Sequence, residues 1–336
     1  MRFTKIAATG ALALALSAGS LAAQDYTLKF AIPTPAAEDS VNAWIHGFEK
    51  LVEQKTQGRI DVQLFFGGQL GSIPTTIEGV AMGTVEAAFT LIGFLSSVDP
   101  RYQVLDASGL FQDEAHANRA FRDPEVRAMF AEFGQRSRTQ LLAAFTNGQT
   151  ALVSRQPIAG TGSFDGLKIR TGGATPLVNR PLEALGASPV SLSIGEVLPA
   201  LQTGTIDAAV ANTQVFVNFK YGDVADQAVY LPGNFLVVGA IISQDFLDRI
   251  GPELAEALQD AAAEALPRYD GMNAEDRAKF EGLWAEAGGT LRQFDPEERA
   301  RYLEVTRAAT EEVLDQNPQL RADYGVLADA ARRTAE

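Results

Sequence analysis

The feature that most constrains the fold is an alternation of strand-like and helix-like segments near the start of the chain. The strand-like runs are short, apolar and bounded by Pro or Gly, whereas the helix-like stretches repeat apolar side chains every three or four residues. Parallel strands need a crossover, which is usually a helix, so a β-α-β-α order predicts a mostly parallel sheet covered by helices. The expected segments are strands at 28–32, 60–66 and 85–91 and helices at 40–54 and 75–82.

A second α/β block begins near Ala151. After Pro252 the pattern becomes helical and rich in alanine, and 296–314 is expected to be a further amphipathic helix. No flexible Gly/Ser linker separates the two blocks, which favours two lobes joined by crossing strands over two domains on a tether. The segments expected in the second block are strands at 167–170, 189–192 and 206–210 and helices at 176–185 and 194–202.

The N-terminus has the pattern of a secretion signal. Arg2 and Lys5 precede an apolar run, and small residues follow it that suit cleavage near Ala22 or Ala23. The run is too short and too rich in alanine to span a membrane comfortably. We therefore interpret 1–23 as a signal peptide and expect a periplasmic protein.

Composition limits the chemistry that the chain can perform. The formal net charge of −14 argues against nucleic-acid binding, which needs a basic surface. Cysteine is absent, which removes thiol catalysis and thiolate metal sites, and His46 and His116 are too few for most histidine metal sites. Phosphate-binding, dinucleotide-binding and nucleophile-elbow motifs are also absent, so we expect binding rather than catalysis and no cofactor.

Arg170 is the strongest candidate for a binding residue. Leu167 and Ile169 alternate with Lys168 and Arg170, as in a strand with one buried side. Small residues follow at 171–173 and leave backbone N–H groups open to a ligand. A guanidinium at such a strand end can hold a carboxylate through two parallel hydrogen bonds. The alternative from the residues alone is a surface arginine in an ordinary salt bridge.

An ordered set of motifs around Arg170 resembles a known family. Residues 164–170 read Phe-Asp-Gly-Leu-Lys-Ile-Arg, 185–190 read Leu-Gly-Ala-Ser-Pro-Val, and 196–207 contain Glu-x-x-x-Ala-Leu-Gln-x-Gly-x-x-Asp. In this order they resemble the solute-binding proteins of tripartite ATP-independent periplasmic (TRAP) transporters, of the dicarboxylate-binding type. The resemblance extends from about Tyr26 to the C-terminus, and no single motif carries it. Further matching segments are 26–31, 48–60, 67–71 and 82–86.

The resemblance implies both a fold and a function. It implies an α/β, two-lobed periplasmic solute-binding protein fold with hinge strands and a long helix spanning both lobes. Such a protein captures a small organic acid, here interpreted as a carboxylate, between its lobes by hinge closure and delivers it to a small and a large membrane subunit. We expect no cofactor and no nucleic-acid partner. Lobe 1 would comprise 24–150 with part of 236–270, and lobe 2 would comprise 151–235 with part of 271–336.

The resemblance also assigns candidate ligand-binding residues. Arg170 would pair with the ligand carboxylate. The loop from Thr90 to Phe94 would form a cleft wall. The loop Glu38-Asp39-Ser40 after the first strand would also reach the site, with Glu38 as the candidate binding residue.

The chain departs from the family pattern at two positions. Many members carry a second arginine after an Asn-Gly pair, where this chain has Gln149, and Asn212 stands one place later than the usual asparagine. One cation fewer suggests a ligand with one carboxylate and hydroxyl, keto or amide groups. The residues expected to bind those groups are Gln149, Thr171, Asn212 and Gln214.

Two other functions stay open from the sequence. A periplasmic ligand-binding subunit of a sensor could have the same sequence features and differ only in its partner. An exported hydrolase or lyase could use a similar scaffold, since a fold does not fix a function. Such an enzyme would need a nucleophile–base pair, and a chain that is poor in histidine and free of cysteine offers little for one.

Overall fold

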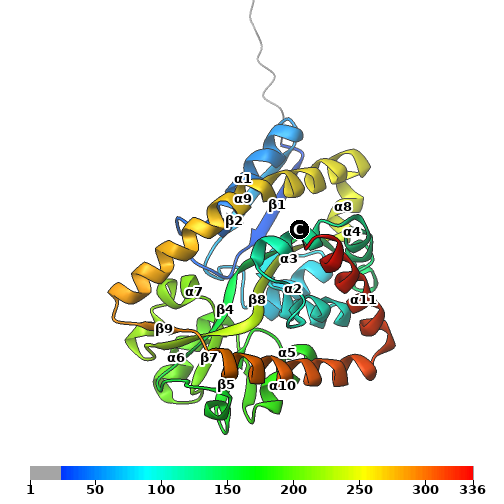
Figure 1. Cartoon of the computed structure of the whole chain (residues 1–336). Helices are drawn as coiled ribbons and strands as arrows, with labels where there is room; N and C mark the ends of the chain where they lie inside the picture. Colours follow the sequence, from blue (N-terminus) through cyan, green and yellow to red (C-terminus); the bar gives the residue numbers. More distant parts are fainter. Residues whose placement is uncertain (1–23, 336) are drawn as a thin grey trace, which may run out of the picture.

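One nine-stranded sheet runs through the computed structural model, which describes residues 24–335 (Figure 1). The predicted signal peptide lies outside the described residues. The strands are β1 Tyr26–Ala31, β2 Ile60–Phe65, β3 Ala87–Leu91, β4 Thr139–Ser154, β5 Lys168–Thr171, β6 Ser188–Ser191, β7 Ala208–Ala211, β8 Gln227–Ser243 and β9 Thr290–Arg292. Their order is β2-β1-β3-β8-β4-β7-β5-β6, and β9 pairs with β8.

Helices cover the sheet and include the five that the sequence pattern predicted in the two α/β blocks. The five predicted helices are α1 Ser40–Lys55, α2 Ile73–Ala81, α5 Pro176–Ala184, α6 Ile194–Thr203 and α10 Pro296–Asp315. The other α-helices are α3 Glu114–Phe121, α4 Pro124–Phe130, α7 Thr213–Asn218, α8 Gln244–Ile250, α9 Pro252–Glu286 and α11 Pro318–Arg333. Short 3₁₀ turns η1 Ile92–Ser97 and η2 Pro100–Asp106 follow β3. Among residues 24–335, no helix combines the length and apolar character needed to cross a membrane.

The sheet is parallel at its two ends and antiparallel in the middle. β1 pairs in parallel with β2 and β3, and β5 pairs in parallel with β6 and β7, as the β-α-β-α order predicts. The long strands β4 and β8 pair antiparallel from Thr139↔Ser243 to Ser154↔Gln227. β3 adds to the 238–242 portion of β8, whereas β7 adds to the 151–154 portion of β4. The two long strands therefore cross from one lobe to the other.

Each lobe has its own apolar core. Trp44 is buried in the first lobe, stacks on Phe48 at 5.8 Å between ring centroids and also packs near Phe30. In the second lobe, Phe216 and Trp284 pack at 5.4 Å. The lobe boundary at 150/151 expected from the sequence falls inside β4, because a crossing strand belongs to both lobes, and the domain limits stay a prediction.

The 35-residue helix α9 spans both lobes (Figure 1). Its first half packs against α1, where Leu258 and Ala261 join the Trp44 core, and its last turns carry Trp284 into the second core. Tyr269, near the middle, is fully buried and its hydroxyl donates a hydrogen bond to the carbonyl oxygen of Thr146 in β4. The helix is thus attached to a crossing strand between the two lobes.

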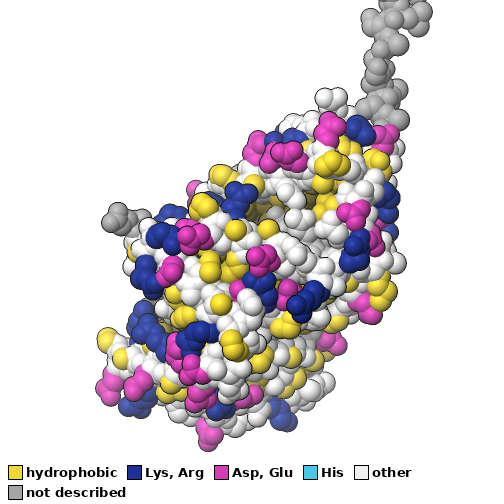
Figure 2. Space-filling model, turned by 90° about the vertical axis from the view of Figure 1, so that its right-hand side faces the viewer, with side chains coloured by type: hydrophobic (Ala, Val, Ile, Leu, Met, Phe, Trp, Pro, Cys, Tyr) yellow, Lys and Arg dark blue, Asp and Glu magenta, His cyan; other side chains and the backbone are white. Residues whose placement is uncertain are grey.

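Acidic and basic side chains are interspersed over the molecular face seen in Figure 2. The net negative charge is therefore not gathered into a single acidic region on that face.

Replacing Tyr269 by Phe tests the attachment of α9 to β4. The substitution removes the hydroxyl and leaves a buried carbonyl oxygen without that donor, so we expect the free energy of unfolding to fall by about 1–3 kcal/mol. Urea denaturation measures it. Tyr324→Phe is the control, because the described structure gives the half-buried Tyr324 hydroxyl no hydrogen bond. Equal stability of both variants would contradict this role of Tyr269.

Candidate functional site

A cavity lies between the lobes, beside the carboxyl ends of β1, β3 and β5 and against the crossing strands. About 670 Å³ of space free of protein atoms lies within it, part of it open to solvent. Both lobes and the crossing strands contribute to its wall. Besides Arg170, the polar residues of that wall are Thr34, Asp39, Thr90, Asn147, Gln214 and Asn218.

Arg170 on β5 is the dominant charge of this cavity. Its side chain is 2% exposed, although it lines the cavity. Nε donates to the carbonyl oxygen of Leu192 at 3.0 Å and Nη1 to that of Val210 at 3.2 Å. No carboxylate among residues 24–335 lies within ion-pairing distance, and burial lowers the pKa of the Arg170 guanidinium. A desolvated cation with neutral partners is costly, and a bound anion would offset that cost.

The first lobe presents polar atoms to the same cavity. The hydroxyl oxygens of Thr34 and Thr90 are buried and have no hydrogen-bond partner in the described structure. Asp39 is 3% exposed and caps α1, with Oδ1 accepting from the backbone N–H and the side-chain amide of Asn42 at 2.8 Å each. The free hydroxyls can serve a neutral polar group, whereas Asp39 makes this end of the cavity unfavourable for an anion.

Four of the eight predicted site residues line the cavity together. Arg170 and Gln214 do so from the second lobe, and Thr90 and Phe94 do so from the first. The resemblance placed Arg170, Thr90 and Phe94 there, and Gln214 was expected to bind a neutral polar group of the ligand.

The other four predicted residues lie outside this wall. Gln149 donates from Nε2 to the carbonyl oxygen of Leu231 at 3.5 Å, within the crossing strands. Asn212 caps α7, and Thr171 is buried, with its hydroxyl donating to the carbonyl oxygen of Gly173 at 2.8 Å. Glu38 is exposed, and only its carbonyl oxygen is engaged, by Lys279 at 2.7 Å. Their role in ligand binding stays a prediction.

Sequence reasoning missed several residues of the wall. Asp39 belongs to the loop Glu38-Asp39-Ser40 that was expected to reach the site, but Glu38 was chosen from that loop as the binding residue. Asn147 was used as a marker for the missing arginine rather than as a wall residue. Asn218 follows Gln214 by one turn on α7, so helical spacing from Gln214 would have found it, and Phe219 is the C-cap residue directly after it. Leu236 lies on β8, a strand that the pattern did not reveal.

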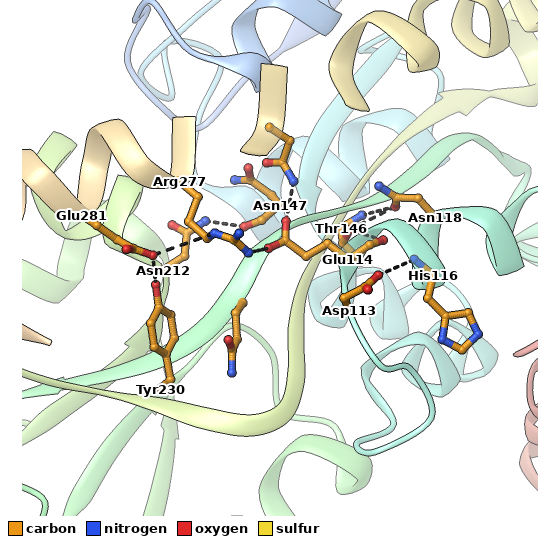
Figure 3. Close-up of polar contacts among 12 residues, drawn as sticks. Asp113, Glu114, His116, Asn118, Thr146, Asn147, Asn212, Tyr230, Arg277 and Glu281 are labelled. Atoms are coloured by element: carbon orange, nitrogen blue, oxygen red, sulfur yellow. Dashed lines mark hydrogen bonds and ion pairs between the residues drawn. The ribbon is translucent and has the colours of Figure 1, made fainter. Parts of the chain in front are cut away.

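A polar network lies beside the cavity where the crossing strands meet α9 (Figure 3). Glu114 of α3 accepts from Arg277 Nη1 at 3.0 Å and from the Asn273 amide, both on α9. Arg277 also approaches Glu281 at 3.9 Å, and the Tyr230 hydroxyl of β8 donates to Glu281. Burial raises the pKa of Glu114. Arg277 is thus engaged by acidic residues of the protein and does not replace the missing ligand arginine.

The two histidines take local structural roles. His46 is exposed beside Glu49, with Nδ1 3.0 Å from its carboxylate. His116 is buried, with Nε2 2.8 Å from the carbonyl oxygen of Ala331. Neither lines the cavity that contains Arg170.

A second, more polar cavity adjoins the first and shares Leu91 and Leu236 with it. Asp106 and Asn234 line it, and each has a buried side-chain oxygen without a hydrogen-bond partner in the described structure. Burial raises the pKa of Asp106 to about 8. The carboxyl group of Asp106 is therefore mostly protonated at neutral pH.

Two lobes joined by crossing strands, with a buried cation facing a cavity between them, define a solute-binding protein of the hinge type. Residues 31–317 match the family described as bacterial extracellular solute-binding protein, family 7 (DctP). The chain belongs to this family and is a solute-binding protein of the TRAP type. The family is one of periplasmic binding proteins that serve transport, not of enzymes.

Relatives and solved structures support the same assignment. The chain is 29% identical over 275 residues to the 2,3-diketo-L-gulonate-binding periplasmic protein YiaO of Escherichia coli K12, covering 82% of each chain. It is 26% identical over 313 residues to the C4-dicarboxylate-binding periplasmic protein DctP of Rhodobacter capsulatus, covering 91% of each. A TRAP periplasmic solute-binding protein from Desulfovibrio salexigens, solved with bound orotic acid, superimposes with a TM-score of 0.86 at 20% identity, over 92% of this chain and 99% of that one. The two-lobed fold is thereby confirmed.

The buried carboxyl of Asp106 predicts a pH-dependent stability. Its pKa is about 8 in the folded protein, whereas an unperturbed aspartate carboxyl group has a pKa of 3.8, so the folded protein holds the proton more tightly than the unfolded chain does. The tighter proton binding by Asp106 contributes to the free energy of unfolding. This contribution is fully present below about pH 4 and is lost as the pH rises toward 8, by at most about 1.4 kcal/mol per pH unit. Asp106→Asn cannot ionise, so its free energy of unfolding relative to the wild type should increase between pH 5 and pH 8.5.

Urea denaturation at several pH values measures this difference. Asp223→Asn, at an exposed position, is the control, and its stability should stay parallel to that of the wild type. Parallel curves for Asp106→Asn and the wild type would show that Asp106 is ionised in the folded protein.

Proposed function

We propose that this protein binds a small organic acid through its carboxylate on Arg170, closes its lobes around the ligand and delivers it to the small and large membrane subunits of a TRAP transporter. The observation that carries the proposal is the buried Arg170 guanidinium, which faces the interlobe cavity without an ionic partner. A carboxylate supplies the charge and the paired acceptors that a guanidinium needs.

The relatives support an organic acid as the ligand. By their names, YiaO binds 2,3-diketo-L-gulonate and DctP binds C4-dicarboxylates, and the Desulfovibrio protein holds orotic acid. All of these ligands carry a carboxylate. We further propose that the chain is exported to the periplasm, with residues 1–23 removed by cleavage near Ala22 or Ala23, and that binding requires no cofactor.

Closure follows from the position of the cavity. Its wall comes from both lobes, so a ligand contacts both only when they are close together, and binding shifts the population toward the closed state. Gly93 of η1 in the first lobe approaches Gly172 after β5 in the second lobe. A Cβ atom on Gly93 would lie 2.8 Å from the carbonyl oxygen of Gly172, closer than real Cβ contacts allow.

The Arg170 experiment separates a ligand-binding arginine from a structural one. The protein is unfolded and refolded to remove retained ligand, and a panel of carboxylates is screened by thermal shift. Arg170→Lys should raise the Kd of the binding compound by about 10–150-fold, equivalent to about 1.5–3 kcal/mol for a charged hydrogen-bonded contact. Arg170→Met should abolish binding.

The stability of ligand-free Arg170→Met supplies the second readout. Replacing a buried, unpaired charge by an apolar side chain is often neutral or stabilising, so its melting temperature should not fall. Arg180→Met, which removes an exposed ion pair with Glu312, should leave binding unchanged. A destabilised Arg170→Met protein that still binds the carboxylate would contradict the proposal, as would the absence of binding by every carboxylate in the panel.

The contact between the lobes gives a prediction about closure. Gly93→Ala should weaken binding about tenfold, because the added methyl group pushes against the Gly172 carbonyl oxygen of the other lobe when the lobes are together, besides its 3.0 Å approach to Asp106 Oδ2 within the first lobe. Gly195→Ala on α6 is the control, since a Cβ atom there meets no atom within 4 Å. Titration calorimetry measures Kd, and small-angle scattering measures compaction on binding. Equal affinities for the two variants would argue against closure at this contact.

A further inference from the structure

We infer that the preferred ligand is a monocarboxylate with an apolar ring or branched body and one neutral polar group, rather than a polyhydroxylated acid or a dicarboxylate. This inference rests on the proposed function and narrows the substrate class of the same site. It is argued from the polarity of each part of the cavity wall.

Most residues of the wall are apolar. Both lobes and the crossing strand β8 contribute large apolar side chains, several of them aromatic, and these side chains outnumber the polar ones. A hydroxyl group placed against such a surface loses its hydrogen bonds to water and gains none, whereas a ring or branched alkyl group gains by leaving water. The side chains that carry this argument are Phe89, Leu91, Phe94, Ile194, Phe219 and Leu236.

Apart from Asn147 on the crossing strand β4, the polar residues of the wall come from two places, one in each lobe. Gln214 and Asn218 lie one turn apart on α7, in the same lobe as Arg170, and can donate to a carboxylate held there. Thr34 follows β1 and Thr90 lies in β3, and these two strands are neighbours in the sheet. Their unpartnered hydroxyls suit one polar group, such as a hydroxyl or keto oxygen, at the first-lobe end.

The charges of the wall disfavour a second carboxylate. Arg170 is the one cationic residue of the cavity wall in the described structure, because Gln149 stands where a second arginine is expected and its amide points to Leu231. Asp39 places an acidic side chain on the first-lobe wall. A dicarboxylate would bring its second negative charge toward Asp39 without a cation to balance it.

The test compares probes of similar size in the refolded, ligand-free protein. Titration calorimetry is carried out with 4-hydroxyphenylacetate, 4-methyl-2-oxopentanoate, D-glucuronate and succinate. We expect at least one of the first two to bind at least tenfold more tightly than D-glucuronate and succinate. Ile194→Thr exchanges hydrocarbon of the wall for a shorter side chain with a hydroxyl group and should weaken that probe about tenfold.

Leu198→Thr is the matched control, because Leu198 is half-buried on the same helix α6 but does not line the cavity, so this variant should bind as the wild type does. D-glucuronate or succinate binding as tightly as the apolar probes, with loss of binding in Arg170→Met, would overturn this inference and leave the proposed function standing. Absence of binding by all four probes and by the wider panel would overturn both. Equal weakening by Ile194→Thr and Leu198→Thr would show that the wall around Ile194 does not select the ligand.

Discussion

The pairing of β4 with β8 is the constraint on which the rest of the structure depends. The two strands are hydrogen-bonded from Thr139↔Ser243 to Ser154↔Gln227, and each lobe adds its own parallel strands to one portion of this ladder. The register shifts at Asn147–Gly148, between the two portions, interrupt the ladder where the cavity lies. A regular ladder is stiff, whereas a bulge bends and twists the strand, so the irregularity lies where a hinge movement must be absorbed.

The ladder also explains how a buried cation can be tolerated. Parallel strands of each lobe have their carboxyl ends at the cavity between the lobes. Thr90 at the end of β3 and Arg170 in β5 therefore line the same cavity. The Arg170 fork is fixed by the carbonyl oxygens of Leu192 and Val210, so its remaining N–H groups are held in place before the ligand arrives. Pre-organisation lowers the entropy lost on binding, and the desolvation cost of the guanidinium has already been met during folding. A carboxylate therefore gains more here than it would at an exposed arginine.

Periodicity predicted the local elements well and the long-range ones poorly. The strands beside Arg170 and the helices α1, α5, α6 and α10 appear within a few residues of their expected limits, because each carries its own pattern and its own boundary residues. β8 was not predicted, since its continuous apolar sequence is interrupted by Pro232-Gly233 and does not alternate. For the site, the resemblance supplied Arg170, Thr90 and Phe94. It also pointed to the loop that holds Asp39, whereas Asn147 and Leu236 reach the cavity only through tertiary structure, which no local pattern encodes.

The hinge network shows why Gln149 changes the site and not only its charge count. A second arginine at this position would stand near Arg277 and the buried Glu114, whose carboxylate already accepts from Arg277. With Gln149, the amide bonds to the Leu231 carbonyl oxygen within the ladder, and Arg277 of α9 is shared between Glu114 of α3 and Glu281 of α9 (Figure 3). Arg170 is then the one cationic side chain of the described cavity wall that can balance a negative charge on the ligand. Because Asp39 opposes any second negative charge, the polarity of the cavity wall, rather than the number of ligand charges, becomes the main determinant of what binds.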